Sequence, residues 1–190
     1  NNIYIVYQET GPKTKSINNQ NKLAIKGPYW NGIIGPYNMS NIENSNLLII
    51  ARGIGQSSIL LPIKKLIDKG NNITLILDKG KLNYLYSLDY IANMNIKIEI
   101  LDIFSTEGDE KLKKFINDNN INAIFSAGAE MLHRKIHSLL IKTDKDINFF
   151  ISNNNTLCCG EGICGSCIRK ISNGEKIKTC KTIINPRYMY

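Results

Sequence analysis

Hydrophobic positions in the middle of the chain form short continuous runs separated by amphipathic stretches. Continuous apolar runs are typical of strands buried on both faces. They lie at 47–51, 73–77, 96–101, 123–126 and 148–151. The stretches between them predict helices from about 56 to Asp68 and over 83–93, 109–118 and 129–141. This β-α alternation predicts an α/β domain over residues 46–152, with a parallel sheet and helices on both faces.

Two residues mark the ends of the first predicted helix. Gly70 stands where a C-terminal cap is expected. Pro62 conflicts with a helix unless it lies in the first turn, so we expect it there.

Residues 1–45 have a different pattern. Two short apolar segments, 3–7 and 22–26, predict strands. A turn signal at 11–14 lies between them, and a second loop follows at 27–32. Two or three strands cannot bury both faces alone. We therefore expect the C-terminal remnant of a β-barrel here, and a chain that is a fragment or has been processed.

Residues 153–190 change pattern again. The run Asn153–Asn155 is typical of a linker, and a loop rich in cysteine and glycine follows at 158–167. Apolar segments at 168–172 and 175–179 flank Asn173-Gly174, a strong hairpin signal. The pattern predicts a small β-rich third domain.

Composition and charge narrow the function classes. The chain has 190 residues, 43% of them hydrophobic and 21% charged, which is ordinary for a globular protein with its own core. No apolar run approaches a membrane span, so we expect no membrane partner. The net charge of +8 comes from lysines spread along the chain, without interleaved aromatic residues. We therefore expect no nucleic-acid partner.

All five cysteines lie between positions 158 and 180. A disulfide framework would spread them out and leave none over. A local cluster of thiols indicates a metal centre in a reducing compartment, which predicts a cytoplasmic protein.

The spacing from Cys159 to Cys164 and Cys167 is C-x4-C-x2-C, and twelve residues separate Cys167 from Cys180. This is the spacing of plant-type [2Fe–2S] sites. Each iron needs two thiolates besides the bridging sulfides, and glycines in the loop permit the necessary close wrapping. The rival metal is zinc, which usually takes paired C-x2-C units, and only one such pair is present. We predict a [2Fe–2S] cluster on these four cysteines, with Cys158 as a spare thiol.

A second candidate site follows the first buried strand. Gly53-Ile54-Gly55 stands between a strand and a helix, the context of a phosphate-binding loop, although a structural turn has the same pattern. No catalytic Ser-His-Asp set is visible.

Asp78 lies 23 residues after Gly55, near the place where an acidic residue commonly binds the ribose 2′-hydroxyl. That role would favour NADH over NADPH. Lys79 and Lys81 flank it and would instead attract a phosphate, and Asp78 is equally consistent with a turn before Gly80.

His133 and His137 share one face of a predicted helix. Arg134 follows the first histidine where a zinc-hydrolase motif requires Glu. We predict two ordinary helix-surface residues.

The segment Cys159–Cys167, after a nucleotide-type α/β domain, resembles the electron-transfer subunits of two-subunit, NAD-linked dihydroorotate dehydrogenases. That family belongs to the ferredoxin–NADP reductase-like superfamily. The resemblance implies an FAD-binding β-barrel, an NAD-binding domain of ferredoxin reductase type and a [2Fe–2S] domain, in that order.

Other segments share the resemblance, which assigns FAD contacts to Gly11 and Thr14. It assigns nucleotide contacts to Gly53, Ile54, Gly55 and Gly128. The segment 27–32 is similar to the one that leads out of the family's barrel, and Tyr29 and Trp30 in it would pack near a flavin or in a core. The chain departs from the family pattern at Arg52, where the family has glycine, at Ser57-Ser58, and at Ala127 and Ala129.

Two functions remain open at this point. In the first, the chain is the electron-transfer component of an oxidoreductase. It passes electrons between NADH, FAD and a partner catalytic subunit through the cluster, and is not a complete enzyme alone. In the second, it is a redox-sensing or structural iron–sulfur module with a degenerate nucleotide domain. A homodimer is compatible with either.

Overall fold

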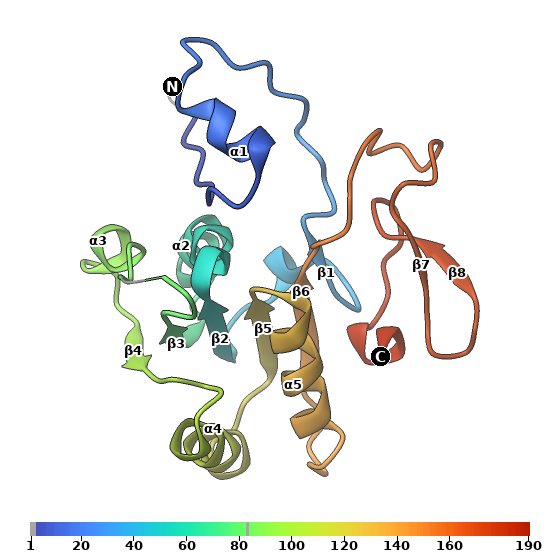
Figure 1. The fold of residues 1–190 in the computed structure, drawn as a ribbon. Helices are drawn as coiled ribbons and strands as arrows, with labels where there is room; N and C mark the ends of the chain where they lie inside the picture. Colours follow the sequence, from blue (N-terminus) through green and yellow to red (C-terminus); the bar gives the residue numbers. More distant parts are fainter. Residues whose placement is uncertain (1–2, 83) are drawn as a thin grey trace.

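The computed structural model describes residues 3–82 and 84–190. Its centre is a six-stranded sheet of order β1-β6-β5-β2-β3-β4 (Figure 1). The strands are β1 (Ile33–Ile34), β2 (Asn46–Arg52), β3 (Asn72–Asp78), β4 (Lys97–Ile100), β5 (Ala123–Ala127) and β6 (Asn148–Ser152). Strands β2 to β6 run parallel, which confirms the predicted α/β domain. The short β1 pairs antiparallel with β6 and was not predicted.

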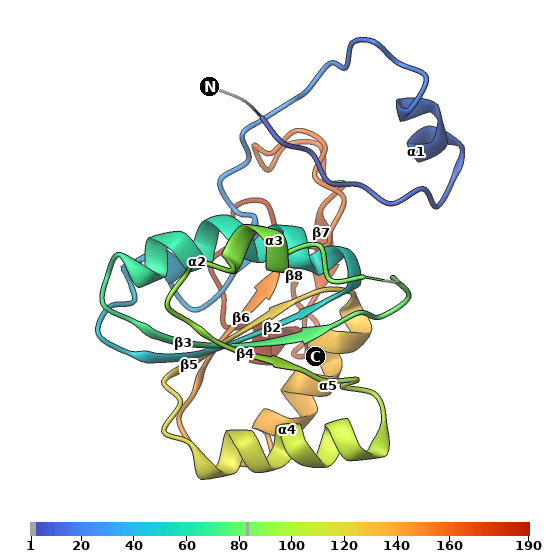
Figure 2. The ribbon, with the colours of Figure 1, turned by 90° about the vertical axis from the view of Figure 1, so that its left-hand side faces the viewer.

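Both faces of the sheet are covered because the strand residues are apolar on both sides. In β2, Leu48 and Ile50 point into one buried cluster, whereas Leu47, Ile49 and Ala51 point into another. The helices are α2 (Leu60–Ile67), α3 (Leu88–Ile91), α4 (Thr106–Asp118) and α5 (Glu130–Leu140). Figure 2 shows α2 and α3 on one face and α4 and α5 on the other.

The first crossover follows the predicted helix boundaries closely. A 3-10 segment, η2 (Gly53–Ile59), leads into α2, so Pro62 falls in the first turn of the α-helix as expected. Gly70 has φ 73° and its N–H donates to the Ile67 carbonyl at 2.9 Å, which confirms the cap. None of the helices in the described ranges is long and apolar enough to span a membrane.

Helix α3 is much shorter than the predicted 83–93. Residue 83 lies outside the described residues. The residues just before α3 are held by side-chain contacts to η2: the Tyr86 hydroxyl donates to the Ile54 carbonyl at 2.9 Å, and the Ser87 hydroxyl donates to Gln56 Oε1 at 2.8 Å. These tertiary contacts override local helix propensity.

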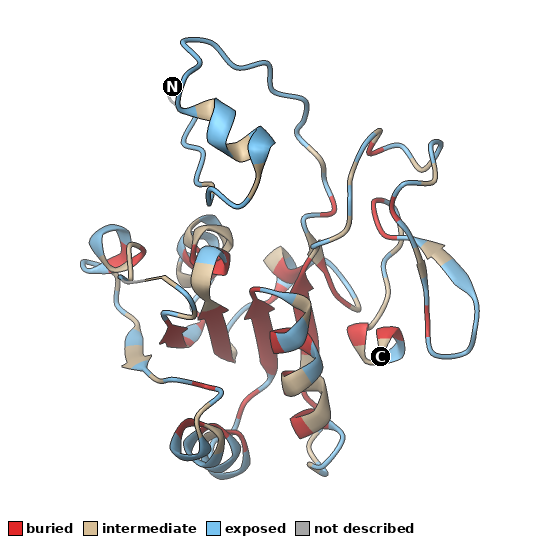
Figure 3. Cartoon of the chain, viewed as in Figure 1, coloured by how far each residue is buried: buried red, intermediate tan, exposed pale blue. Residues whose placement is uncertain are grey.

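The two strands predicted at 3–7 and 22–26 are wrong. The described residues before β1 contain one helix, α1 (Pro12–Ile17), where a turn was predicted, and no strand. Pro12 is the first helical residue and Thr14 caps the helix at Gly11, which explains why the turn signal starts a helix. A strand needs a hydrogen-bonding neighbour, and Ile3 and Tyr4 are instead 79% exposed. Figure 3 shows the described residues before β1 largely exposed and apart from the buried sheet. No barrel remnant is therefore confirmed.

The C-terminal region forms the predicted hairpin. Strands β7 (Ile168–Lys170) and β8 (Lys176–Lys178) pair antiparallel, and Gly174 closes the turn with φ 90°. The chain then returns through a short 3-10 helix, η3 (Pro186–Met189), which packs near β6. Another 3-10 turn, η1 (Met39–Asn41), precedes β2.

An ion pair fixes the hairpin to the α/β domain. The Arg169 guanidinium donates to both oxygens of Glu130, at 3.1 and 2.6 Å. The Tyr190 ring lies under Arg169 and Arg134, with centroid distances of 5.0 and 5.1 Å. Because Glu130 begins α5, this contact joins the helix to β7.

Candidate functional site

The cysteine loop curls because of its glycines. Gly160, Gly162 and Gly165 have φ of 72°, 72° and 75°, a left-handed conformation that is strained for other residues. These reversals turn backbone N–H groups inward, and the N–H groups of Glu161 and Cys164 donate to Cys159 Sγ at 3.3 and 3.5 Å. Hydrogen bonds to cysteine sulfur are what a bound iron–sulfur cluster requires for tuning its potential.

The four cysteines are arranged as two pairs. Cys164 is the neighbour of Cys159, to whose Sγ it donates its N–H at 3.5 Å, and Cys167 is the neighbour of Cys180. Among the described residues, no three Cys, His, Asp or Glu side chains converge to hold a single metal ion. Two pairs of soft thiol ligands fit a two-iron cluster, in which each iron takes two thiolates.

The loop also stabilises thiolates unevenly. The Ser166 hydroxyl, 2.8 Å from Cys164 Sγ, and nearby N–H groups lower the pKa of Cys164 to about 6. Backbone N–H groups, that of Cys164 first, lower the pKa of Cys159. The neighbouring thiol of Cys167, together with burial, raises the pKa of Cys180. Since the thiolate is the metal ligand, Cys159 and Cys164 are more readily deprotonated than Cys180.

Sequence reasoning missed a contact between the segment 27–32 and the cysteine loop. The Tyr29 hydroxyl donates to the Cys158 carbonyl at 2.7 Å. Its ring fills the space beside Gly160, where a Cβ would lie 2.3 Å from the ring. Asn31 donates to the Thr182 carbonyl at 3.1 Å and also to that of Thr179. Tyr29 therefore packs on the cysteine loop, whereas Trp30 is exposed.

The two glycine loops follow β2 and β5, which are neighbouring strands at the centre of the sheet. The connection after β2 leads to β3 on one side, and the connection after β5 leads to β6 on the other. Their carboxyl ends therefore form a topological switch point, where nucleotides bind in folds of this class.

Close packing at this switch point requires glycine. A Cβ on Gly55 would lie 2.2 Å from the Ala127 carbonyl oxygen, and one on Gly128 would lie 3.2 Å from the Arg52 carbonyl oxygen. Gly53 has φ 57°, and Ile54 between the glycines is exposed. The structure thus brings together the four residues predicted for nucleotide binding.

Asp78 lies beside this loop but its carboxylate is engaged. Oδ2 accepts from Arg52 Nε and from the Ile103 N–H, both at 3.0 Å, and Oδ1 accepts from the Gly80 N–H at 2.7 Å. The residue combines the predicted turn role before Gly80 with a long-range ion pair that the sequence did not reveal.

Gly11 and Thr14 lie away from the other predicted residues, on α1 (Figures 1 and 2). The Thr14 hydroxyl accepts from the N–H groups of Thr10 and Gly11 at 3.0 and 3.1 Å. No side chain of α1 is buried. These two residues offer polar groups, and the helix itself supplies no buried surface for a flavin.

The prediction of surface histidines is wrong for His133. Its ring is fully buried, with Nδ1 2.8 Å from Ser126 Oγ and Nε2 3.0 Å from Asn154 Nδ2. Asn154 also donates to the Gly128 carbonyl. Because the amide donates to Nε2, the neutral ring carries its proton on Nδ1 and donates it to Ser126. The network holds the Gly128 loop, and burial lowers the pKa of His133 to about 4.

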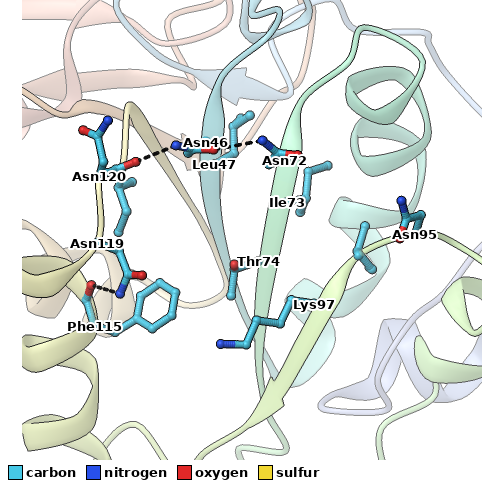
Figure 4. A pocket seen from close by; sticks show the side chains of 12 residues that line it. Asn46, Leu47, Asn72, Ile73, Thr74, Asn95, Lys97, Phe115, Asn119 and Asn120 are labelled. Atoms are coloured by element: carbon cyan, nitrogen blue, oxygen red, sulfur yellow. Dashed lines mark hydrogen bonds between the residues drawn. The ribbon is translucent and has the colours of Figure 1, made fainter.

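A cleft of about 390 Å³ lies at the other edge of the sheet, at the amino ends of β2, β3 and β4 (Figure 4). Its asparagines bond to one another and to the backbone. Asn72 donates to Asn46 at 3.1 Å, Asn46 to the Asn120 carbonyl at 3.0 Å and Asn119 to the Phe115 carbonyl at 2.8 Å. This cleft lies at the end of the sheet opposite the switch point, and its amides serve the fold.

Comparison with known proteins shows that this sequence is similar to several electron-transfer subunits. The chain is 24% identical over 188 residues to the electron transfer subunit of dihydroorotate dehydrogenase B (NAD(+)) of Clostridium perfringens, covering 95% of this chain and 72% of that protein. It is 22% identical over 180 residues to the corresponding subunit of Streptococcus pneumoniae, covering 92% and 69%. The predicted resemblance is confirmed. This chain is a relative of those electron-transfer subunits.

A third relative has a similar name. The probable electron transfer subunit of dihydroorotate dehydrogenase B in Methanocaldococcus jannaschii is 27% identical over 146 residues, covering 72% of this chain and 54% of that protein. The chain thus spans between about half and three quarters of the length of these relatives. No family model matches the chain.

A solved structure supports the fold. It is that of an NADH-dependent reduced ferredoxin–NADP oxidoreductase, determined for insight into flavin-based electron bifurcation. Its TM-score with this chain is 0.69 at 18% identity, covering 92% of this chain and 63% of the other. The mixed α/β architecture with a mostly parallel sheet is therefore of ferredoxin-reductase type.

Proposed function

We propose that this chain is the electron-transfer component of an oxidoreductase complex and holds a [2Fe–2S] cluster on Cys159, Cys164, Cys167 and Cys180. The observation that supports this most is the glycine-curled loop that carries Cys159, Cys164 and Cys167, in which the N–H groups of Glu161 and Cys164 already donate to Cys159 Sγ, with Cys180 beside Cys167. When bound, such a cluster stores and releases single electrons.

Each of the three regions of the chain would have its own role in this function. Residues 46–152 would bind a reduced pyridine nucleotide at Gly53, Ile54, Gly55 and Gly128. Residues 1–45, with Gly11 and Thr14, would contribute to a flavin site, and residues 153–190 would form the cluster domain. A catalytic oxidoreductase subunit would be the partner, in keeping with the names of the relatives.

The described contacts give this chain's residues specific positioning roles. Tyr29 packs against Gly160 and bonds to Cys158, so it fixes one side of the cysteine loop. Arg169 lies two residues after Cys167 and is held by Glu130, which lies two residues after Gly128. A fixed spacing between nucleotide loop and cysteine loop is what electron transfer through bound cofactors needs from the protein.

The cellular compartment that we propose for this protein rests on the same thiols. Free cysteines of lowered pKa are oxidised easily outside a reducing environment. We therefore propose a cytoplasmic location, which the relatives' names do not address.

Metal analysis of the purified protein tests the cluster. About two irons and two labile sulfides per chain are expected, with the visible absorbance and the paramagnetic resonance of a reduced [2Fe–2S] centre. Changing Cys159, Cys164, Cys167 or Cys180 to Ser should remove or distort these signals. The matched control is Cys158→Ser, which should retain them.

Two other results would point elsewhere. A colourless protein with one zinc per chain would refute the cluster. A chain with an intact cluster that no reduced pyridine nucleotide can reduce, even with flavin and partner present, would favour the redox-sensing module instead.

A further inference from the structure

The nucleotide site contains an acidic residue in the expected place whose carboxylate is used elsewhere. Asp78 ends β3 and lies directly opposite Arg52, the last residue of β2, in the parallel register. In dinucleotide-binding units an acidic residue here accepts a hydrogen bond from the ribose 2′-hydroxyl and so selects NAD. That selection requires a carboxylate oxygen that is free to face the ligand.

The Asp78 carboxylate is buried and already accepts from protein donors. It is held by three donors, one of them the charged Arg52 guanidinium, and the residue is 3% exposed. Releasing it would leave the Gly80 and Ile103 N–H groups without their acceptor, which is unfavourable. The carboxylate therefore serves to position Arg52 and the turn at Gly80.

Asp78 was expected to bind the ribose 2′-hydroxyl and to repel a 2′-phosphate. Arg52 is placed to attract a 2′-phosphate instead. Only its Nε is used by Asp78, and its guanidinium lies over the Phe104 ring at 4.7 Å to the centroid. Among described residues, its terminal nitrogens make no further hydrogen bond, and its side chain is 23% exposed. A guanidinium fixed in this way presents a planar pair of donors that suits a phosphate.

The position of Arg52 ties it to the switch point. Its Cβ would lie 3.5 Å from a Cβ on Gly128, and its Nη1 would lie 3.4 Å from one on Gly80. The side chain therefore extends from the glycine loops toward the turn that follows β3, along the edge where a nucleotide's adenosine ribose is expected.

The charges around this edge are mostly positive. Lys79 and Lys81 are exposed on the turn after β3. The connection after β4 also carries Asp102, whose Oδ1 accepts from the Phe104 N–H at 3.2 Å. Lys135 Nζ lies 5.2 Å from the centroid of the Phe104 ring and is paired with Asp109. Among the described residues, Arg52, Lys79 and Lys81 have no ion pair with a carboxylate other than Asp78.

Resting on the nucleotide function proposed above, we propose that this site takes a pyridine nucleotide that carries a 2′-phosphate, with Arg52 as the phosphate ligand and Lys79 and Lys81 as supporting charges. This replaces the expectation that Asp78 selects NADH. A 2′-phosphate gains charge-assisted hydrogen bonds here, whereas the 2′-hydroxyl of NAD meets an Asp78 carboxylate that is buried and bound to Arg52.

Calorimetric titration of the full chain with NADP⁺ and NAD⁺ tests the proposal, because the two probes differ only in the 2′-phosphate and neither reduces the protein. We expect NADP⁺ to bind roughly tenfold more tightly. The preference should shrink as salt is raised, since exposed charges are screened.

Variants assign the preference to residues. Arg52→Gln should bring the two affinities to near equality. Because this change leaves Asp78 buried without its cation, the double variant Arg52→Gln/Asp78→Asn, which removes both charges, should be measured beside it. Lys97→Ala is the matched control, since Lys97 lies on β4 and lines the cleft at the other end of the sheet; it should leave both affinities unchanged.

The outcomes separate the two proposals. NAD⁺ binding as tightly as NADP⁺ to the unmodified chain would overturn the 2′-phosphate preference and leave nucleotide binding intact. A preference for NADP⁺ that survives in both Arg52 variants would overturn the role of Arg52. Absence of binding by either nucleotide would overturn the nucleotide function itself, together with this inference, while the iron analysis above stays independent of it.

Discussion

The cysteine loop and the switch-point loop are both shaped by glycine, yet they are held in different ways. In the cysteine loop, three glycines with positive φ curl ten residues, and the hydrogen bonds to Cys159 come from within the same segment. In the switch-point loop, Gly55 is pressed against Ala127, a residue far along the chain. A site of the first kind depends on local sequence, and one of the second kind depends on the whole sheet.

This difference explains how much the sequence alone could predict. The cysteine spacing and the Asn173-Gly174 turn are local patterns, and the structure has the corresponding loop and hairpin. The apolar runs predicted five strands, of which the edge strand β4 is partly exposed and the other four are largely buried on both faces. The pairing of Arg52 with Asp78, 26 residues apart, has no local signal.

The wrong predictions have the same origin. Residues 3–7 have strand-like composition, but a strand forms only beside another, and none accompanies them in the described part of the chain. His133 was predicted on the surface because helix periodicity does not reveal that Ser126 and Asn154 would surround it. Contacts between distant segments decide both cases.

The largest effect that we expect is a loss of iron after a substitution in the cysteine loop. Gly160→Ala should cost the protein most of its iron, because the added Cβ would lie 2.3 Å from the Tyr29 ring and the φ of 72° is strained for alanine. Iron content and visible absorbance are the measurements. Since neither Tyr29 nor the cysteine loop belongs to the hydrophobic clusters of the sheet, the midpoint of thermal unfolding should change little.

A second variant separates the two causes in that prediction. Adding Tyr29→Ala to Gly160→Ala removes the collision but keeps the unfavourable φ, so it should recover part of the iron. Full iron content in the single variant would mean that the loop tolerates a side chain at this position.

At the switch point we expect the reverse pattern, a loss of stability with the iron retained. Gly55→Ala would place a Cβ 2.2 Å from a backbone oxygen, which cannot move without shifting β5. Overpacking of this kind costs about 3 kcal/mol or more, to be measured by denaturant unfolding. Gly32→Ala is the control, because a Cβ there meets no atom within 4 Å, and it should unfold like the unmodified chain.

The smallest effect that we expect is on the pH dependence of stability. It arises from His133, whose hydrogen bonds to Ser126 and Asn154 support the Gly128 loop. Burial lowers the pKa of His133 to about 4, from an ordinary value of 6.5. A histidine with a depressed pKa in the folded state opposes folding only where the unfolded state is already protonated. The stability of the neutral, buried form is therefore complete above pH 6.5 and declines as the pH falls toward 4, by up to about 3 kcal/mol.

Replacing the histidine tests this assignment. His133→Gln keeps an amide that can bond to Ser126 or Asn154 but does not titrate, so its unfolding free energy should change much less between pH 6.5 and 4.5. His137→Gln is the control on the same helix; its residue is only partly buried, and the variant should retain most of the pH dependence. Parallel slopes for His133→Gln and the unmodified protein would show that other groups dominate acid sensitivity. The iron content should stay constant throughout, because the contacts of His133 lie with the Gly128 loop rather than with the cysteines.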